Sequence, residues 1–237
     1  GMVDQGVAKA NIAEVATDAV DTLAADRVAP VVASIDPDPF YDFTQERPLV
    51  EIDTDGGGEV RVIRWPENSF EIVRGVGGRD LVVLVGVEPH LHWRTYSACI
   101  REVVAVTGCE AVVTVGSGAE AVPHTRTPLV TGSTTDADLA LRLGIGQPTY
   151  QGVTGVIGVV QADLAAAGVP SVSLRVGVPH YLMNAEHPQA VAALVAQMSI
   201  WPGRHWVAVR VDFVKPWMPS TLAVAAALFV LEAVVMK

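Results

Sequence analysis

Three stretches of this chain read as buried strands that run directly into a Pro-His turn. They are Leu81 to His90, Ala111 to His124 and Val172 to His180. Proline ends a strand ladder because it has no N–H to donate, and the histidine that follows brings a titratable ring to the strand end. Ligands usually bind at the carboxyl ends of parallel strands. We therefore expect the three histidines on one side of a sheet, with at least one of them held by structural hydrogen bonds.

The order of the predicted elements indicates an α/β protein. Predicted helices over 93–107, 152–167 and 187–198 alternate with the Val-rich strands, and such continuous apolar runs are typical of parallel strands buried on both faces. Before them, residues 49–65 alternate, turn at a run of glycines and alternate back, as a β-hairpin does. We predict a three-layer α/β sandwich with a mostly parallel central sheet and a β-hairpin insertion.

Composition limits the partners of this chain. Its formal charge is −10 at pH 7 and it has no basic stripe, which argues against nucleic acid and against a polybasic membrane patch. The two cysteines, Cys99 and Cys109, do not have a metal-ligand spacing. The first residues lack the basic and apolar regions of a signal peptide. We expect a cytoplasmic protein.

The C-terminal segment differs from the rest of the chain in its residue composition. Residues 205–213 alternate like a strand, and residues 221–236 are almost entirely apolar, with Glu232 as their one charged residue. A membrane span over 217–236 is one interpretation, but Pro219 and Glu232 leave its apolar part short of the ~20 residues a bilayer requires. We favour a buried or oligomer-contacting helix.

The first Pro-His turn carries the polar cluster Glu88, His90, His92 and Arg94. Two imidazoles separated by one residue can bind a metal from an extended segment. The alternative is that Pro89 forces a turn and these polar side chains cap the helix that follows. We assign no metal site.

The other two turns offer His124 with Arg126, and His180 with Tyr181. A neutral histidine near an arginine can bind an anion or polarise a carbonyl. We favour the alternative, in which Arg126 pairs with a carboxylate such as Glu88 or Glu120.

A glycine-rich turn precedes the helix expected over 152–167. Backbone N–H groups near Gly152, Thr154 and Gly155 could hold an anion at the start of that helix, or the glycines could serve a close helix–sheet crossing. The turn matches neither a P-loop nor a dinucleotide fingerprint. Ser117 lacks the five-residue pattern of a nucleophile elbow. We assign no catalytic residue and no cofactor.

An aromatic, acidic loop runs over 36–48. Its residues suit a contact surface better than proton transfer, and the alternative is that the loop folds its aromatic rings beneath itself. The interaction residues that we assign to it are Asp36, Asp38, Phe40, Tyr41 and Phe43.

Seven motifs in order together resemble the proteasome assembly chaperone family, in its actinobacterial branch. They are Gly-x-Val-Asp-x-Gly, Asp-Pro-Asp-x-Phe-Tyr-Asp-Phe, Arg-Pro, Gly-Val-Glu-Pro-His-Leu-His-Trp-Arg, Pro-His-Thr-Arg, Tyr-Gln-Gly-Val-Thr-Gly-Val-Ile-Gly-Val and Val-Pro-His-Tyr. The resemblance covers about residues 1–198. It implies a phosphorylase/hydrolase-like fold, a homo-oligomer that is often trimeric, and no established enzyme activity. Residues 199–237 would form a strand-plus-apolar-helix extension packed on that domain.

Two functional hypotheses follow. The preferred one is a non-enzymatic, homo-oligomeric assembly chaperone or interaction scaffold, whose partners would be other copies of itself and possibly proteasome subunits. The alternative is a small-molecule enzyme of the nucleoside phosphorylase or hydrolase type. That enzyme would use His90, His124, Arg126 and His180 around one strand-end pocket.

Overall fold

The computed structural model describes residues 11–24, 29–54, 58–76, 79–182, 185–199, 206–211 and 230–236. The helices are α1 (Asn11–Ala24), α2 (Trp93–Thr107), α3 (Ala137–Leu143), α4 (Val156–Ala166) and α5 (Pro188–Ser199), with a short 3-10 helix at His180–Leu182. The strands are β1 (Val31–Ile35), β2 (Leu49–Asp53), β3 (Val60–Arg64), β4 (Asn68–Val76), β5 (Arg79–Gly86), β6 (Val112–Glu120), β7 (Val130–Thr134), β8 (Ser171–Pro179), β9 (Trp206–Val211) and β10 (Val230–Met236).

One large sheet runs through the molecule in the order β1-β4-β5-β10-β9-β6-β8-β7. Parallel pairing joins β5 to β9, β9 to β6 and β6 to β8. The other pairings in this sheet are antiparallel among the described strands. The predicted mostly parallel central sheet is therefore wrong, and with it the phosphorylase/hydrolase-like assignment. A Val-rich run reports burial on both faces, which does not reveal the direction of the neighbouring strand.

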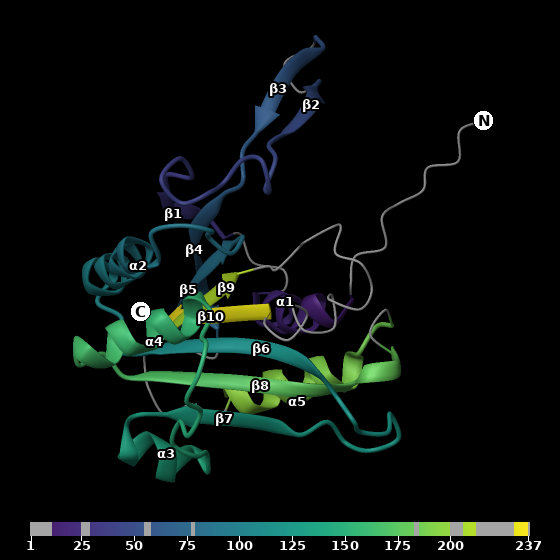
Figure 1. Ribbon diagram of the computed structural model, residues 1–237, viewed down its shortest axis with the longest axis vertical. Helices are drawn as coiled ribbons and strands as arrows, with labels where there is room; N and C mark the ends of the chain where they lie inside the picture. The colour runs from purple at the N-terminus through teal and green to yellow at the C-terminus, as the bar shows by residue number, and fades with distance from the viewer. Residues whose placement is uncertain are drawn as a thin grey trace.

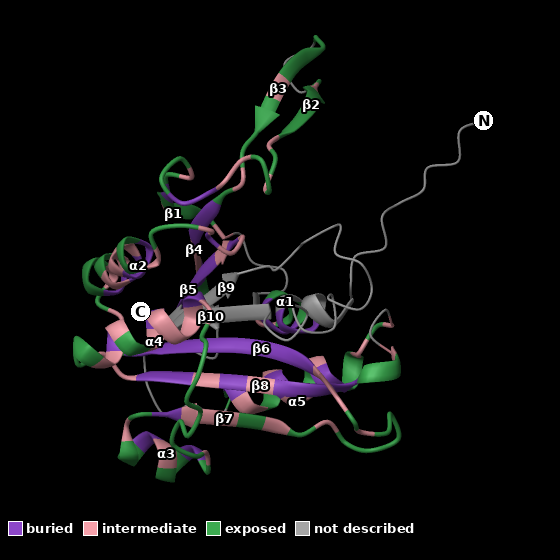
Figure 2. Ribbon diagram, in the orientation of Figure 1, coloured by how far each residue is buried: buried purple, intermediate pink, exposed green. Residues whose placement is uncertain are grey.

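Helices cover both faces of the sheet (Figure 1). On one face, apolar residues of α1 and α5 pack with alternate residues of β6 and β8, such as Val113 and Val172. On the other face, α2 and α4 pack against Val82 and Val112, together with aromatic residues of the 36–48 loop. Figure 2 shows the consequence, because β6 and β8 are buried along most of their length.

The hairpin predicted over 49–65 is present as β2 and β3, which pair with each other in a separate two-stranded sheet. It projects from the body at the end away from α3 (Figure 1). Both of its strands are exposed along nearly their whole length (Figure 2). The hairpin therefore does not contribute to either core.

The C-terminal segment contributes strands to the sheet. The strand predicted over 205–213 is present as β9, and Val230–Met236, which we expected in an apolar helix, forms β10 instead. Residues 212–229, which hold the rest of that expected helix, lie outside the described residues. Among the described helices, none has both the length and the apolar character that crossing a bilayer needs.

Gly86 allows a close approach between β5 and β4. It is the ladder partner of Asn68, and a Cβ built on Gly86 would lie 1.7 Å from Asn68 Oδ1 and 2.9 Å from Asn68 Cα. The amide of Asn68 thus occupies the space that any side chain at residue 86 would need. No comparable neighbour exists at Gly146, where a Cβ meets nothing within 4 Å.

We predict that Gly86→Ala destabilises the protein by about 1–3 kcal/mol, because backbone as well as side-chain atoms of Asn68 must move. Urea denaturation of the variant and the wild type measures this change. The control, Gly146→Ala, should stay within about 0.5 kcal/mol of the wild type. Equal stabilities for Gly86→Ala and the wild type would contradict the close contact.

Candidate functional site

The three Pro-His turns lie at one edge of the large sheet. β5, β6 and β8 run in the same direction, because β9 pairs parallel with both β5 and β6, and β6 pairs parallel with β8. Their carboxyl ends therefore meet at the same edge, where the sequence analysis places the turns. We call this edge, with the turns at His90, His124 and His180, the strand-end rim.

The first turn is bound to the 36–48 loop. The backbone N–H groups of His90 and Leu91 both donate to the Phe40 carbonyl, at 2.9 and 3.0 Å. The backbone N–H of Asp42 donates to Nδ1 of His90 at 3.2 Å. Because that nitrogen accepts a hydrogen bond, it carries no proton in this arrangement. His90 thus has a structural role in holding the loop.

Three buried polar side chains support this turn from below. The Tyr41 hydroxyl donates to the Val87 carbonyl at 2.5 Å and accepts from the Asn68 amide. The Tyr96 hydroxyl donates to Asn68 Oδ1 at 2.9 Å. Buried polar groups cost free energy unless they are paired, and here each finds a partner in the other two or in the backbone. Burial raises the pKa of both Tyr41 and Tyr96 above the ordinary value, since it disfavours the ionised phenol.

The interaction loop divides into a buried and an exposed part. Phe40 and Tyr41 are buried in the core, and Phe43 packs edge-to-face on Trp65 at a ring-centroid separation of 4.9 Å. Asp36 and Asp38 are exposed. The loop therefore folds most of its aromatic surface beneath itself, the alternative left open by the sequence.

Asp42 organises the turn that follows in the loop. Its carboxylate accepts from Gln45 Nε2 at 2.8 Å, from Thr44 Oγ1 at 2.6 Å and from the Thr44 N–H at 2.9 Å. These bonds to Gln45 and Thr44 favour the ionised form and lower the pKa of Asp42 to about 2. The acidic residue at this position stabilises its own loop and stays ionised at neutral pH.

The remaining polar residues of the first turn face solvent at the start of α2. His92 is the N-cap residue of α2 and has φ 53°, but its ring makes no capping hydrogen bond. Arg94 is exposed, while the Trp93 indole donates to the Pro89 carbonyl at 2.6 Å. Within the described ranges, no three His, Cys, Asp or Glu side chains gather so that they could hold a metal ion.

Glu88 approaches the glycine-rich turn that starts α4. Gly155 is the N-cap residue of α4, and a Cβ built on it would lie 3.8 Å from Glu88 Oε1. Negative charge is favourable near a helix N-terminus. The Glu88 carboxylate therefore lies near the N-terminus of α4, where an added anion would meet its negative charge. Thr154 Oγ1 occupies the space beside Gly158, 1.9 Å from a Cβ built there, which explains a glycine at that position.

The second and third turns are joined to each other. The backbone N–H of His124 donates to the Tyr181 hydroxyl at 2.8 Å, and the Nδ1 of the same histidine lies 3.0 Å from that oxygen. The Nδ1 of His180 lies 3.2 Å from the Glu120 carbonyl. The rings of His180 and Tyr181 meet edge-to-face at 5.4 Å. These four residues form the exposed corner of the rim where β6 and β8 end.

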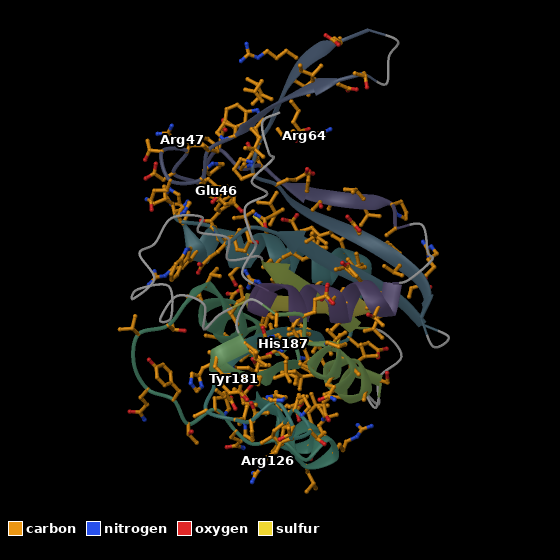
Figure 3. All side chains as sticks on the ribbon, turned by 90° about the vertical axis from the view of Figure 1, so that its right-hand side faces the viewer. Glu46, Arg47, Arg64, Arg126, Tyr181 and His187 are labelled. Atoms are coloured by element: carbon orange, nitrogen blue, oxygen red, sulfur yellow. The ribbon has the colours of Figure 1, made fainter. Side chains whose placement is uncertain are left out.

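Arg126 does not have the role that the sequence suggested. It is exposed, and no ion pair with Glu88 or Glu120 is present among the described residues. Figure 3 shows it at the opposite end of the molecule from Arg64 of the hairpin. The expected pairing is therefore wrong.

Two residues at or beneath the rim escaped the sequence analysis. Asn68 carries no local signal, because its role depends on tyrosines distant in sequence. Arg175 does carry one: it is the single charged residue in the apolar strand β8. Charged residues are rarely buried, so a charge within an apolar strand is a signal that the sequence analysis could have used.

A scan against protein families matches residues 10–201 to the PAC2 family. The chain belongs to the PAC2 family. A solved PAC2 family protein from Streptomyces avermitilis is 36% identical, with a TM-score of 0.72 and 80% of each chain covered. A proteasome-assembly chaperone homologue from Mycobacterium tuberculosis is 33% identical, with a TM-score of 0.70, 82% of this chain covered and 81% of the other. The comparison with curated proteins finds no match.

A solved archaeal protein has a similar fold. The proteasome activator PbaB from Pyrococcus furiosus is 16% identical, with a TM-score of 0.59 and 80% of this chain and 79% of that chain covered. At this identity the likeness concerns the fold alone. The PAC2 assignment confirms the resemblance on which the sequence analysis relied.

We predict that Tyr41→Phe destabilises the protein by about 1–3 kcal/mol, because the Asn68 amide and the Val87 carbonyl lose a buried partner. Chemical denaturation measures the loss. Tyr181→Phe removes an exposed hydroxyl and should change stability by less than about 0.5 kcal/mol. If both variants behave alike, the buried network does not support the rim.

The same tyrosines predict how stability depends on alkaline pH. Because burial raises the pKa of Tyr41 and Tyr96, the unfolded chain loses these protons first, at about pH 10. Their contribution is complete below that pH and decreases as pH rises further. The difference in denaturation midpoint between Tyr41→Phe and the wild type should therefore be smaller at about pH 11 than at about pH 8. The difference between Tyr181→Phe and the wild type should not decrease in this way.

Proposed function

We propose that this PAC2 chain is a non-enzymatic, homo-oligomeric assembly chaperone or interaction scaffold that works in the cytoplasm. Its partners would be further copies of itself, in a trimer, and possibly proteasome subunits. The observation that carries the proposal is the projecting hairpin formed by β2 and β3, which exposes apolar side chains to solvent.

One face of the hairpin is almost wholly apolar. Ladder pairing puts Val50 opposite Ile63 and Ile52 opposite Arg61, and side chains opposite one another share a face. The exposed fractions are 52% for Val50, 66% for Ile52 and 56% for Ile63. Trp65, at the end of the same face, is 49% exposed. We call these four residues the hairpin patch.

The opposite face of the hairpin is mixed. Leu49 and Val60 are exposed on this face. The same face carries an ion pair, in which Arg64 Nε lies 2.7 Å from Glu51 Oε2. An isolated two-stranded hairpin is marginally stable in water, and exposed apolar surface of this kind marks interaction sites. These properties support a role in which another protein covers the patch.

The relatives support the same proposal. The proteasome-assembly chaperone homologue from Mycobacterium tuberculosis is similar over most of both chains. The rim also supports it, because His90, His124 and His180 are each used in contacts within the protein. We further propose that residues 1–198 form the family domain and that 199–237 pack on it. The packing is supported by β9 and β10, which pair with β5 and β6 within the large sheet.

We predict that the full chain elutes as a trimer, with a mass about three times its 25.0 kDa, in size-exclusion chromatography with light scattering. The triple variant Val50→Ser/Ile52→Ser/Ile63→Ser should shift that mass to the monomer without loss of the folded state, because these side chains belong to neither core.

The control is Val106→Ser, a change at a residue that is 79% exposed on α2 and outside the hairpin. It should leave the mass unchanged. A wild-type chain that is a monomer at all concentrations would contradict the homo-oligomer, and an unchanged mass for the triple variant would contradict the role of the hairpin patch.

A further inference from the structure

Arg175 of β8 is a charged residue whose Nε has no hydrogen-bond partner in the part of the chain that the structure describes. It is half-buried on the sheet face that carries α4, and its Nε is shielded from solvent and makes no hydrogen bond. No ion pair involves its guanidinium among the described residues. A shielded guanidinium N–H without an acceptor costs free energy, so such groups are rare in folded proteins unless a ligand or partner supplies the acceptor.

The sheet is shaped to let this side chain lie flat. A Cβ built on Gly118 of β6 would lie 2.0 Å from Arg175 Nη2, so the guanidinium crosses from β8 over β6. In return, a Cβ built on Gly177 of β8 would lie 2.3 Å from Glu120 Oε2, so that carboxylate crosses from β6 over β8. Gly118 and Gly177 are partners in the ladder. Two glycines therefore make room for two oppositely charged side chains.

Arg175 and Glu120 lie over neighbouring residues, yet they do not pair. No ion pair joins them among the described residues, so Glu120 does not supply the acceptor that the Arg175 Nε lacks. The planar fork of an arginine matches a carboxylate, which it can bind through two parallel hydrogen bonds. Because the Glu120 carboxylate lies close by, a group with a single negative charge suits the position better than a doubly charged phosphate.

Two exposed side chains lie near the ends of the same strands. Leu129 precedes β7, its carbonyl accepts from the Gly177 N–H at 3.3 Å, and its side chain is 69% exposed. Tyr181, two residues past the end of β8, is 52% exposed. An apolar group attached to the bound carboxylate would cover this surface.

We propose that Arg175 binds the carboxylate of a ligand that also carries an apolar group, at the carboxyl ends of β6 and β8. Two sources offer this chemistry: the free carboxyl terminus of a polypeptide with an apolar last residue, and a small apolar carboxylic acid. The nearby Glu120 carboxylate would weaken this binding through repulsion. The site does not depend on the hairpin patch or on the oligomeric state.

Isothermal titration calorimetry with the full chain tests the site with defined probes. N-acetyl-leucine carries a carboxylate beside an apolar group, and N-acetyl-leucinamide is its uncharged counterpart. We expect saturable binding of the first and none of the second. A five-residue peptide that ends in a free leucine separates the sources: tighter binding than N-acetyl-leucine indicates a polypeptide terminus, and equal or weaker binding indicates a small acid.

Three variants assign the binding to Arg175. Arg175→Met should weaken N-acetyl-leucine binding by about tenfold or more, and Arg175→Lys, which keeps the charge but lacks the fork, by a smaller factor. Glu120→Gln should strengthen binding by about threefold, because it removes the nearby negative charge. The matched control is Arg142→Met at an exposed position on α3, which should leave binding unchanged.

Several results would overturn the proposal. They are the absence of saturable binding by either carboxylate probe, equal binding by the amide, and undiminished binding to Arg175→Met. A further one is a Glu120→Gln variant that loses stability while its probe binding is unchanged, since that result means that the two residues pair in solution. If Arg175→Met does not fold, Arg175→Lys decides. A monomeric wild type leaves these results unaffected, so failure of the site and failure of the proposed oligomer are separable.

Discussion

The contact on which much of this structure depends is the hydrogen bond between Tyr41 and Asn68. These residues flank the hairpin insertion in sequence, Tyr41 before β2 and Asn68 as the first residue of β4. Their bond therefore closes the insertion at its base. Tyr96 extends the closure to α2, and the contact of Phe43 with Trp65 repeats it nearer to the hairpin. These side chains hold together the segment that enters the hairpin, before β2, and the segment that leaves it, at the start of β4.

This closure also positions the rim. The loop that carries Tyr41 supplies the Phe40 carbonyl and the Asp42 N–H that bind the first Pro-His turn. The same tyrosine bonds to Val87, where β5 gives way to that turn. One buried network thus connects the base of an exposed arm with the edge of the sheet. A change in this network should alter both the base of the hairpin and the first Pro-His turn, although the two are distant in the sequence.

Local sequence patterns predicted most helices and strands correctly, but they did not predict which strands are neighbours or in which direction they run. The Val-rich strands, the hairpin and the Pro-His turns all follow from short-range composition, and each is present. The composition of a strand does not reveal the direction of its neighbours: β4 pairs antiparallel with the next strand, β5, and β10 joins the sheet from the distant C-terminal segment. A sheet expected to be mostly parallel is therefore mostly antiparallel. The run at 230–236 is apolar at every position but one, and such a run has no period that distinguishes a strand from a helix.

For the candidate sites, too, the sequence predicted local positions but not the contacts between distant segments. The sequence placed the three histidines at one edge, because strand ends and proline are readable locally. It did not show what each ring touches. The partner of His124 comes from the end of β8, and the space for Arg175 comes from a glycine on another strand. Arg126 lies between β6 and β7 and is exposed, whereas Arg175 lies within β8 and is half-buried.

The closed base also determines the mechanical behaviour of the hairpin. Each strand of the hairpin has five residues, so the arm is about 17 Å long from its base. A rotation of about 10° where Phe43 meets Trp65 would displace the tip by about 3 Å. A turn of the arm about this contact would redirect the hairpin patch, while the strand pairing of the large sheet and its strand-end rim stayed the same.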